Sequence, residues 1–231
     1  MLNAIKFAKP DGILIAGDMV VEKTRKNRAR IGYRKAENLI TTLASQYPVY
    51  YENGNHESRW KRNKDRHSEK FMDYRKRLAA AGVHFLENES LRIGKLRITG
   101  LELPNDYFHK KIRIPKLSAK GIESMTGSAD PDCFNILLAH SPQFFKAYMD
   151  WGADLVLAGH FHGGMVRFPV FGGAVSTYFR PFPRYDHGVF RYGDQRMIVS
   201  AGLGMHSIPI RINNPEELVI IELHSGGHTR L

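Results

Sequence analysis

Six polar side chains, spread over most of the 231-residue chain, are of types that hold metal ions or move protons. Each lies shortly after an apolar stretch of strand length; they are Asp18, Asn55, His56, His140, His160 and His162. Imidazole nitrogen combined with carboxylate or amide oxygen suits divalent Mn, Fe, Zn, Co or Ni. A site built from several thiolates is excluded, because Cys133 is the only cysteine of the chain.

The chemistry that such a set could perform is metal-assisted hydrolysis. Two ions about 3.5–4 Å apart can activate a water molecule and clamp a phosphoryl group. Asp18 suits the bridging position, because a carboxylate can give one oxygen to each ion. His160 and His162 lie in a loop flanked by Gly159 and Gly163, whose conformational freedom lets each imidazole face a different ion.

The elements that must position these side chains alternate between strands and helices. Apolar runs predict four strands that precede the candidates, over 12–16, 48–51, 135–139 and 154–158. Helical periodicity predicts helices over 2–8, 33–46, 68–81 and 142–150. Further strands are predicted over 83–85, 90–93, 96–99, 188–191, 197–201 and 218–223, and a turn over 53–56. Because strand ends of such an arrangement meet at one rim of a sheet, the candidates are expected to converge.

Composition and hydropathy exclude several classes of protein. With 42% apolar and 25% charged residues, the chain is neither disordered nor collagen-like. Its longest apolar runs are far shorter than the ~20 residues of a membrane-spanning helix, and residues 1–10 do not resemble a secretory signal. The sequence therefore predicts a single, cytoplasmic domain over residues 1–231.

The chain is strongly basic, with 34 Lys and Arg against 23 Asp and Glu, a formal charge of +11. The excess is concentrated in 23–35 and 59–77. Such charge attracts phosphorylated small molecules, lipid headgroups, an anionic membrane surface or nucleic acid. Nucleic acid is the less favoured partner, because Tyr33 is the only aromatic residue of the first run and bases stack on aromatic rings. Solvated loops and helix faces explain the charge equally well, and no protein partner is predicted.

Four segments, in their order along the chain, resemble the motifs of the calcineurin-like metallophosphoesterases: Gly17-Asp18, Gly54-Asn55-His56-Glu57, His140 and Gly159-His160-Phe161-His162. Residues 139–143 and 159–169 are similar to a bacterial branch of small, often membrane-associated phosphoesterases. The resemblance extends over nearly the whole chain. It implies an α/β fold of four layers, two mixed sheets flanked by helices, with two divalent ions at the strand ends.

The resemblance also implies a role for each candidate. The metal ligands would be Asp18, Asn55, His140, His160 and His162. Asp18 would bridge the two ions, His162 would belong to the first ion, and the other three would complete the second. His56 would be the general acid that protonates the leaving-group oxygen, and Asn55 would also contact the phosphate.

One motif of that family is absent from this chain. It is an Asp-x-His at the end of the family's first strand, which supplies two ligands to the first ion and orients the catalytic histidine. Asp11 and His67 are the nearest substitutes, and neither fits well. We therefore expect the domain to lack its first strand, to be poorly soluble or unstable as written, and to hold only one ion by itself. If an upstream segment exists, it would make the protein membrane-associated.

Three functions remain open at this point. The first is a metal-dependent phosphoesterase acting on a phosphate monoester, diester or pyrophosphate, with metal-activated water as nucleophile and His56 as general acid. The second is a catalytically impaired binding or scaffold protein with one metal ion or none. The third is a nuclease or nucleic-acid binder that uses the basic face.

Overall fold

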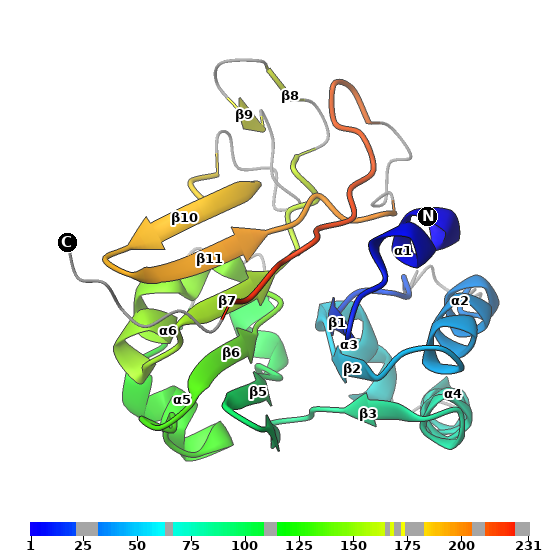
Figure 1. Ribbon diagram of the computed structural model, residues 1–231, viewed down its shortest axis with the longest axis horizontal. Coiled ribbons are helices and arrows are strands. Elements are labelled where there is room, and N and C mark those ends of the chain that lie inside the picture. The colour runs from blue at the N-terminus through cyan, green and yellow to red at the C-terminus, as the bar shows by residue number, and fades with distance from the viewer. Residues whose placement is uncertain are drawn as a thin grey trace.

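The chain folds into two β-sheets with helices packed on their outer faces (Figure 1). In Figure 1 the smaller sheet lies on the right with α2 and α4, and the larger one on the left with α5 and α6. The computed structural model describes residues 1–21, 32–62, 67–108, 115–164, 167–168, 172–173, 183–204 and 211–224. Most of the basic run predicted to attract anions, at 22–31, lies outside these ranges.

The smaller sheet has three parallel strands in the order β1-β2-β3. They are β1 (Ile13–Ala16), β2 (Val49–Glu52) and β3 (Val83–Phe85). Their connections include α2 (Arg34–Ala44), α3 (Asn55–Arg62) and α4 (His67–Ala80). Fully buried side chains of these helices fill the core against the sheet, namely Ile40, Trp60, Phe71, Tyr74 and Leu78.

The larger sheet has six strands in the order β10-β11-β7-β6-β5-β4. They are β4 (Ser90–Ile93), β5 (Leu96–Gly100), β6 (Phe134–Leu138), β7 (Leu155–Ala158), β10 (Gly188–Tyr192) and β11 (Gln195–Val199). The four inner strands are parallel, whereas β4 and β10 are antiparallel edge strands. Two helices cover the outer face, α5 (Ala119–Thr126) and α6 (Phe145–Trp151).

The shorter elements lie around these layers. They are α1 (Leu2–Ala8), the single-turn helices η1 (Asn105–Phe108) and η2 (Pro142–Phe144), and the hairpin of β8 (Arg167–Phe168) and β9 (Gly172–Gly173). On α1 the side chain of Phe7 is 90% exposed. Among the described helices, none is both long and apolar enough to cross a membrane.

A third apolar core separates the two sheets. It contains Tyr50 from β2, Ile98 from β5 and Leu138 from β6. Strand β2 shows why: Val49 and Tyr51 face the helices while Tyr50 faces the other sheet, since side chains alternate along a strand. The order of the layers is therefore helices, sheet, sheet, helices, and the predicted four-layer α/β fold is confirmed.

Most predicted elements are present, with two differences. The turn predicted over 53–56 is wrong in its second half, because Asn55 begins α3 and Ser58 N donates to Gly54 O. The strand predicted over 218–223 is not formed within the described part of the chain. That segment runs beside β11 (Figure 1), but β11 already pairs with β7 and β10 on its two edges.

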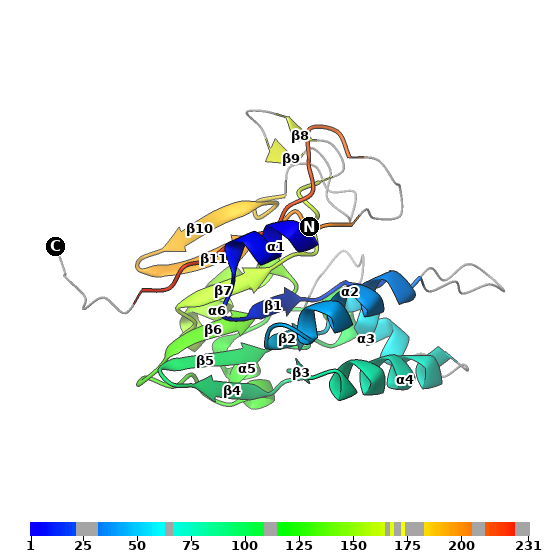
Figure 2. The same ribbon diagram turned by 45° about the vertical axis from the view of Figure 1, so that its right-hand side comes forward.

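The first strand, β1, is an edge strand among the described residues and pairs only with β2. Figure 2 shows that β1 and β5, from different sheets, run in the same direction. Asp18 lies beyond the end of β1, whereas Asp11 precedes its start. Asp11 is therefore at the opposite end of the strand and does not substitute for the absent motif, and the His67 side chain is outside the described part.

Candidate metal centre

The loops that follow β1, β6 and β7 bring three of the predicted ligands together. One ligand atom each of Asp18, His140 and His160 lies within 4.8 Å of the other two. His140 Nε2 is 3.0 Å from Asp18 Oδ2 and 3.2 Å from His160 Nδ1. Residues from three loops that lie far apart along the chain thus meet between the two sheets.

The backbone fixes which nitrogen of His140 faces this cluster. His140 Nδ1 lies 2.7 Å from the carbonyl oxygen of Ala16, the last residue of β1, and donates to it. The remaining nitrogen, Nε2, is then turned toward Asp18, where its lone pair would serve a bound cation in place of a proton. A second hydrogen bond of this kind typically sets the tautomer of a metal-binding histidine.

The pKa values of the three cluster residues favour binding of a cation. Burial disfavours ionisation of Asp18, yet the neighbouring imidazoles, His140 foremost, hold its pKa well below the ordinary value. Burial also opposes protonation of His140, but the Asp18 carboxylate raises its pKa. The pKa of His160 is lowered well below its usual range by burial and by His140, so this imidazole is neutral and can donate a lone pair.

Asn55, the first residue of α3, supplies a fourth polar group. One atom of its amide lies 2.7 Å from His160 Nδ1. With Nδ2 in that place the amide donates to His160, and its oxygen accepts from Arg59 Nη2 at 2.6 Å. With Oδ1 in that place instead, the amide oxygen of Asn55 faces atoms that also present lone pairs, such as His160 Nδ1. A cation between these atoms would stabilise that arrangement. One carboxylate, two imidazoles and one amide therefore fit a borderline divalent ion.

The remaining predicted ligand, His162, lies outside this cluster. It is half-buried and follows β7 by four residues, whereas His160 follows it by two. Its loop is held by the buried Asn214, whose Nδ2 donates to the carbonyl oxygens of His162 and Gly164 at 2.5 and 2.7 Å. No local pattern around Asn214 distinguishes it, so the sequence did not indicate this contact.

Three of the candidate ligands have a left-handed backbone. The φ angles are 54° at Asp18, 69° at His160 and 51° at His162. Non-glycine residues rarely adopt this conformation, which costs on the order of 1 kcal/mol or more and tends to occur at functional sites. The surrounding contacts must therefore impose it on both loops, the one after β1 and the one after β7.

One of these contacts comes from Glu57, whose part in the site was missed although it lies in the predicted motif. Its carboxylate accepts from the backbone N–H groups of Asp18 and Gly54 at 2.9 and 3.1 Å, and from the Tyr51 hydroxyl at 2.8 Å. Burial, followed by the Asp18 charge, raises the pKa of Glu57 to about 7. This buried carboxyl group joins the loop after β1 to the turn after β2.

Glycines allow those two loops to approach closely. A Cβ at Gly17 would lie 2.3 Å from Gly54 N, and a Cβ at Gly54 would lie 2.3 Å from Asp18 Oδ1. Neither distance is tolerated, so any side chain at either position would push Asp18 away from His140. The glycines of the two short motifs are thus explained by packing between loops.

Helix α3 is held in place by a second acidic residue that was not anticipated. Glu102, 5% exposed, follows β5 and accepts hydrogen bonds from Ser58 Oγ at 2.9 Å and from Lys61 Nζ at 3.0 Å. The same carboxylate accepts from Asn53 Nδ2 at 3.2 Å. Because α3 carries Asn55, these bonds connect the site to the larger sheet.

The proposed acid, His56, lies at the start of α3 and is buried. Its backbone N–H donates to Asp18 Oδ1 at 2.9 Å, and its Nδ1 lies 3.2 Å from Arg59 Nη2. His56 is therefore adjacent to the cluster, on the side of α3.

A neighbouring carboxyl group, Glu52, has no hydrogen-bond partner among the described residues and is fully buried. Burial raises its pKa well above the ordinary value, and the charges of Glu102, Glu57 and Asp18 raise it further. Glu52 is therefore neutral, which keeps a further negative charge out of the site.

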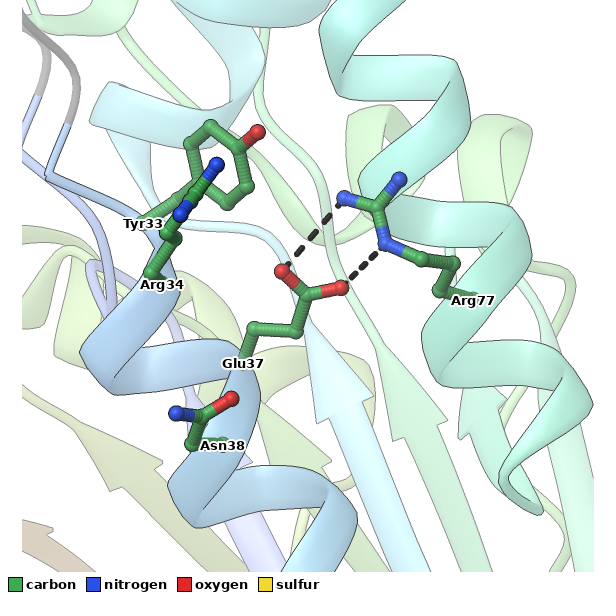
Figure 3. Close-up of a pocket in the computed structure, with 5 residues that line it drawn as sticks. All are labelled: Tyr33, Arg34, Glu37, Asn38 and Arg77. Atoms are coloured by element: carbon green, nitrogen blue, oxygen red, sulfur yellow. Dashed lines mark hydrogen bonds and ion pairs between the residues drawn. The ribbon is translucent and has the colours of Figure 1, made fainter.

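A cavity of about 430 Å³ opens elsewhere, between α2 and α4 on the outer helical layer (Figure 3). It is lined by Tyr33, Arg34, Glu37, Asn38 and Arg77. Glu37 and Arg77 form an ion pair across it. None of the candidate residues at the strand ends lines this cavity, so it is separate from the candidate metal centre.

Comparison with known proteins places the chain among its relatives. The chain is 28% identical over 226 residues to an uncharacterized metallophosphoesterase of Helicobacter pylori strain J99, which covers 96% of this chain and 54% of that protein. It is 27% identical over 217 residues to the phosphodiesterase YaeI of Escherichia coli, covering 93% and 71% of the two chains. It is 26% identical over 219 residues to the uncharacterized metallophosphoesterase YkoQ of Bacillus subtilis, covering 92% and 72%.

These matches differ in how much of each relative they cover. The chain spans about half the length of the Helicobacter relatives. No solved structure matches it. The family model described as calcineurin-like phosphoesterase matches residues 1–164, which include all four of the predicted metal-binding motifs. The chain belongs to the calcineurin-like phosphoesterase family.

Proposed function

We propose that this chain is a metal-dependent phosphoesterase domain that hydrolyses a phosphate monoester, diester or pyrophosphate. The observation that carries the proposal is the buried cluster of Asp18, His140 and His160 at the ends of three strands. A divalent ion held there would activate a water molecule for attack on phosphorus and neutralise charge on the phosphoryl oxygens. Asn55 would complete the ligand set and also contact the phosphate.

Individual residues of the chain would have separate roles in the reaction. Asp18 supplies the negative charge of the site, and the Ala16 carbonyl keeps His140 Nε2 facing inward. His56, at the start of α3, would give a proton to the leaving-group oxygen. Its position beside the cluster supports this, because its backbone N–H is bonded to the same Asp18 carboxylate.

We also propose that the site holds its two ions with unequal affinity. One ion would bind the cluster, and a weaker one would use Asp18 and His162. The alternative is a catalytically impaired protein that holds a single ion. The position of His162 outside the cluster is the observation that favours it. Ion content decides between them: two ions per chain support the enzyme, and one supports the alternative.

The substrate would carry an anionic phosphate, either on a small molecule or on a lipid headgroup, and the basic surface would favour an anionic membrane over nucleic acid. The E. coli relative is named a phosphodiesterase, which makes a diester the first substrate to test. The chain's excess of 34 basic over 23 acidic residues suits any of these anions.

The test is hydrolysis of bis(p-nitrophenyl) phosphate and p-nitrophenyl phosphate by the Mn-loaded chain. We expect release of nitrophenolate that stops after chelation and returns with Mn. An Asp18→Asn variant purified in parallel controls for contaminating phosphatases. A folded chain that binds Mn and hydrolyses neither ester would contradict the proposal.

A further inference from the structure

The three cations of α3 differ in what they contact. Lys61 Nζ lies 3.0 Å from Glu102 and Arg62 Nη2 lies 3.5 Å from it. Arg59 forms no ion pair with any carboxylate in the described part of the chain. Its Nη2 lies instead 3.2 Å from His56 Nδ1, and its Nε donates to the backbone oxygen of Asn55 at 3.1 Å.

Helical spacing explains this position. Arg59 follows Asn55 by four residues and His56 by three, so the three side chains share one face of α3. Asn55 and His56 are buried, whereas Arg59 is exposed. The guanidinium therefore lies at the solvent side of the two residues that the proposed function places on the phosphate.

The Arg59 guanidinium also has N–H donors that these contacts do not use. Arginine has five N–H donors in a planar fork, and the contacts with Asn55 and His56 use only part of it. Neither contact supplies negative charge, so the cation is uncompensated within the described residues. A planar fork of this kind matches two oxygens of a phosphate.

We infer that Arg59 is a substrate-binding residue that receives the non-bridging oxygens of the phosphoryl group. The inference rests on the proposed function, which supplies the phosphate, but it concerns a residue outside the metal cluster. Arg59 then binds phosphate from the side of α3, opposite the ligands contributed by the larger sheet. Its exposure lets it contact the anion before the anion reaches the buried ligands.

The experiment measures binding of inorganic phosphate to the Mn-loaded chain by titration calorimetry, with Mn content determined for every sample. Arg59→Ala should raise the Kd for phosphate about 10- to 100-fold, the scale expected for a hydrogen bond to a charged group. Arg59→Lys should recover part of this affinity, because it restores the charge but not the fork. Lys70→Ala, which removes an exposed cation of α4, should bind phosphate as the unaltered chain does. Mn content should be the same in all four proteins.

Three outcomes would overturn the inference. They are an unchanged Kd in Arg59→Ala, a fall in Mn content that parallels the loss of phosphate, and no phosphate binding by the unaltered chain. The second outcome would mean that Arg59 only stabilises the start of α3. If the unaltered chain binds phosphate through Arg59 but hydrolyses no ester, the proposed function fails while this inference stands.

Discussion

The two halves of the site differ in how firmly the fold positions them. Asp18, His140 and His160 each lie two residues after the end of a strand: 16 to 18, 138 to 140 and 158 to 160. His162 lies four residues after the same strand as His160 and outside their cluster. A side chain two residues from a strand end is placed by the sheet, whereas one further along depends on contacts within its loop. The clustered half is therefore expected to bind metal more tightly than the loop half.

The largest expected effect is in the clustered half. Asp18→Asn removes the only carboxylate of the cluster and should lower kcat/KM for a phosphate ester by at least about 1,000-fold, because the ion supplies several kcal/mol to the reaction. The chain should also lose its tightly bound ion. Steady-state kinetics and elemental analysis measure the two effects, and a variant that kept the ion would refute the assignment of Asp18 as ligand.

The next effect concerns the contact that fixes α3 to the larger sheet. Glu102→Ala should reduce the free energy of unfolding by about 2–4 kcal/mol, because it breaks the partly buried ion pair between Lys61 and Glu102. The loss is limited because Lys61 keeps its other ion pair, with Glu87 at 3.0 Å. Urea unfolding measures this loss. Glu89→Ala, an exposed acidic residue nearby, should change stability by less than about 0.5 kcal/mol. Equal losses in the two variants would show that the Glu102 contacts contribute nothing.

Two histidine variants test the comparison directly. His160→Ala should weaken binding of the first Mn by more than about 100-fold, because removing a ligand costs more than removing the partner of a ligand. His162→Ala should leave that first ion in place and remove only the weaker second one. Titration of the metal-free proteins with Mn gives both values. If the two variants behaved alike, the two halves would be equivalent.

A smaller effect is expected from the residue that holds the loop half. Asn214→Ala leaves the carbonyl oxygens of His162 and Gly164 without their donor and should cost about 1–3 kcal/mol of stability. Its affinity for the first Mn should stay the same, because the cluster makes no use of Asn214. Thermal melts with and without Mn test both statements, and a weakened first ion would mean that the halves are coupled.

The smallest effect is a pH dependence of the metal-free chain. The pKa of Glu57 is raised to about 7 and that of His140 is raised above its ordinary value, so both groups hold protons when folded that they release on unfolding. Their stabilising contribution is complete at low pH and is lost as the pH rises. The lowered pKa of His160 acts in the opposite sense only below about pH 6.5.

Stability should therefore fall as the pH rises above about 6.5, where the last of the Glu57 proton and the extra proton of His140 are lost. Urea unfolding in the presence of a chelator measures the trend. His162→Ala should retain the trend and His140→Ala should weaken it. Stability that rose over this range would contradict the assignment of these protons to the clustered half.

Much of the candidate site could be predicted because its candidate ligands lie two residues after apolar strands. The runs before Asp18, His140 and His160 have strand length and composition, and parallel strands end at a common rim. The contacts of Glu102 and Asn214 could not be assigned, because their partners lie 41 to 52 residues away and nothing local distinguishes them. Glu57 lies in a predicted motif, but its bond to the backbone of Asp18, 39 residues away, depends on the tertiary structure. The strand predicted over 218–223 failed for a similar reason: its apolar run is present, but both edges of the neighbouring β11 are already paired.

By itself the sequence determined most of the strands and helices and their order along the chain, and it supplied the candidate metal ligands. These follow from hydrophobic periodicity and from residue chemistry, which are local properties, whereas the four layers were expected from the resemblance of the motifs to a known family. Only the tertiary structure decided that Asn55 begins a helix, that His162 lies outside the cluster, and that Arg59 faces His56 with no carboxylate partner in the described ranges. Such facts depend on distances between segments far apart in the chain, and the packing of the two sheets against each other sets those distances.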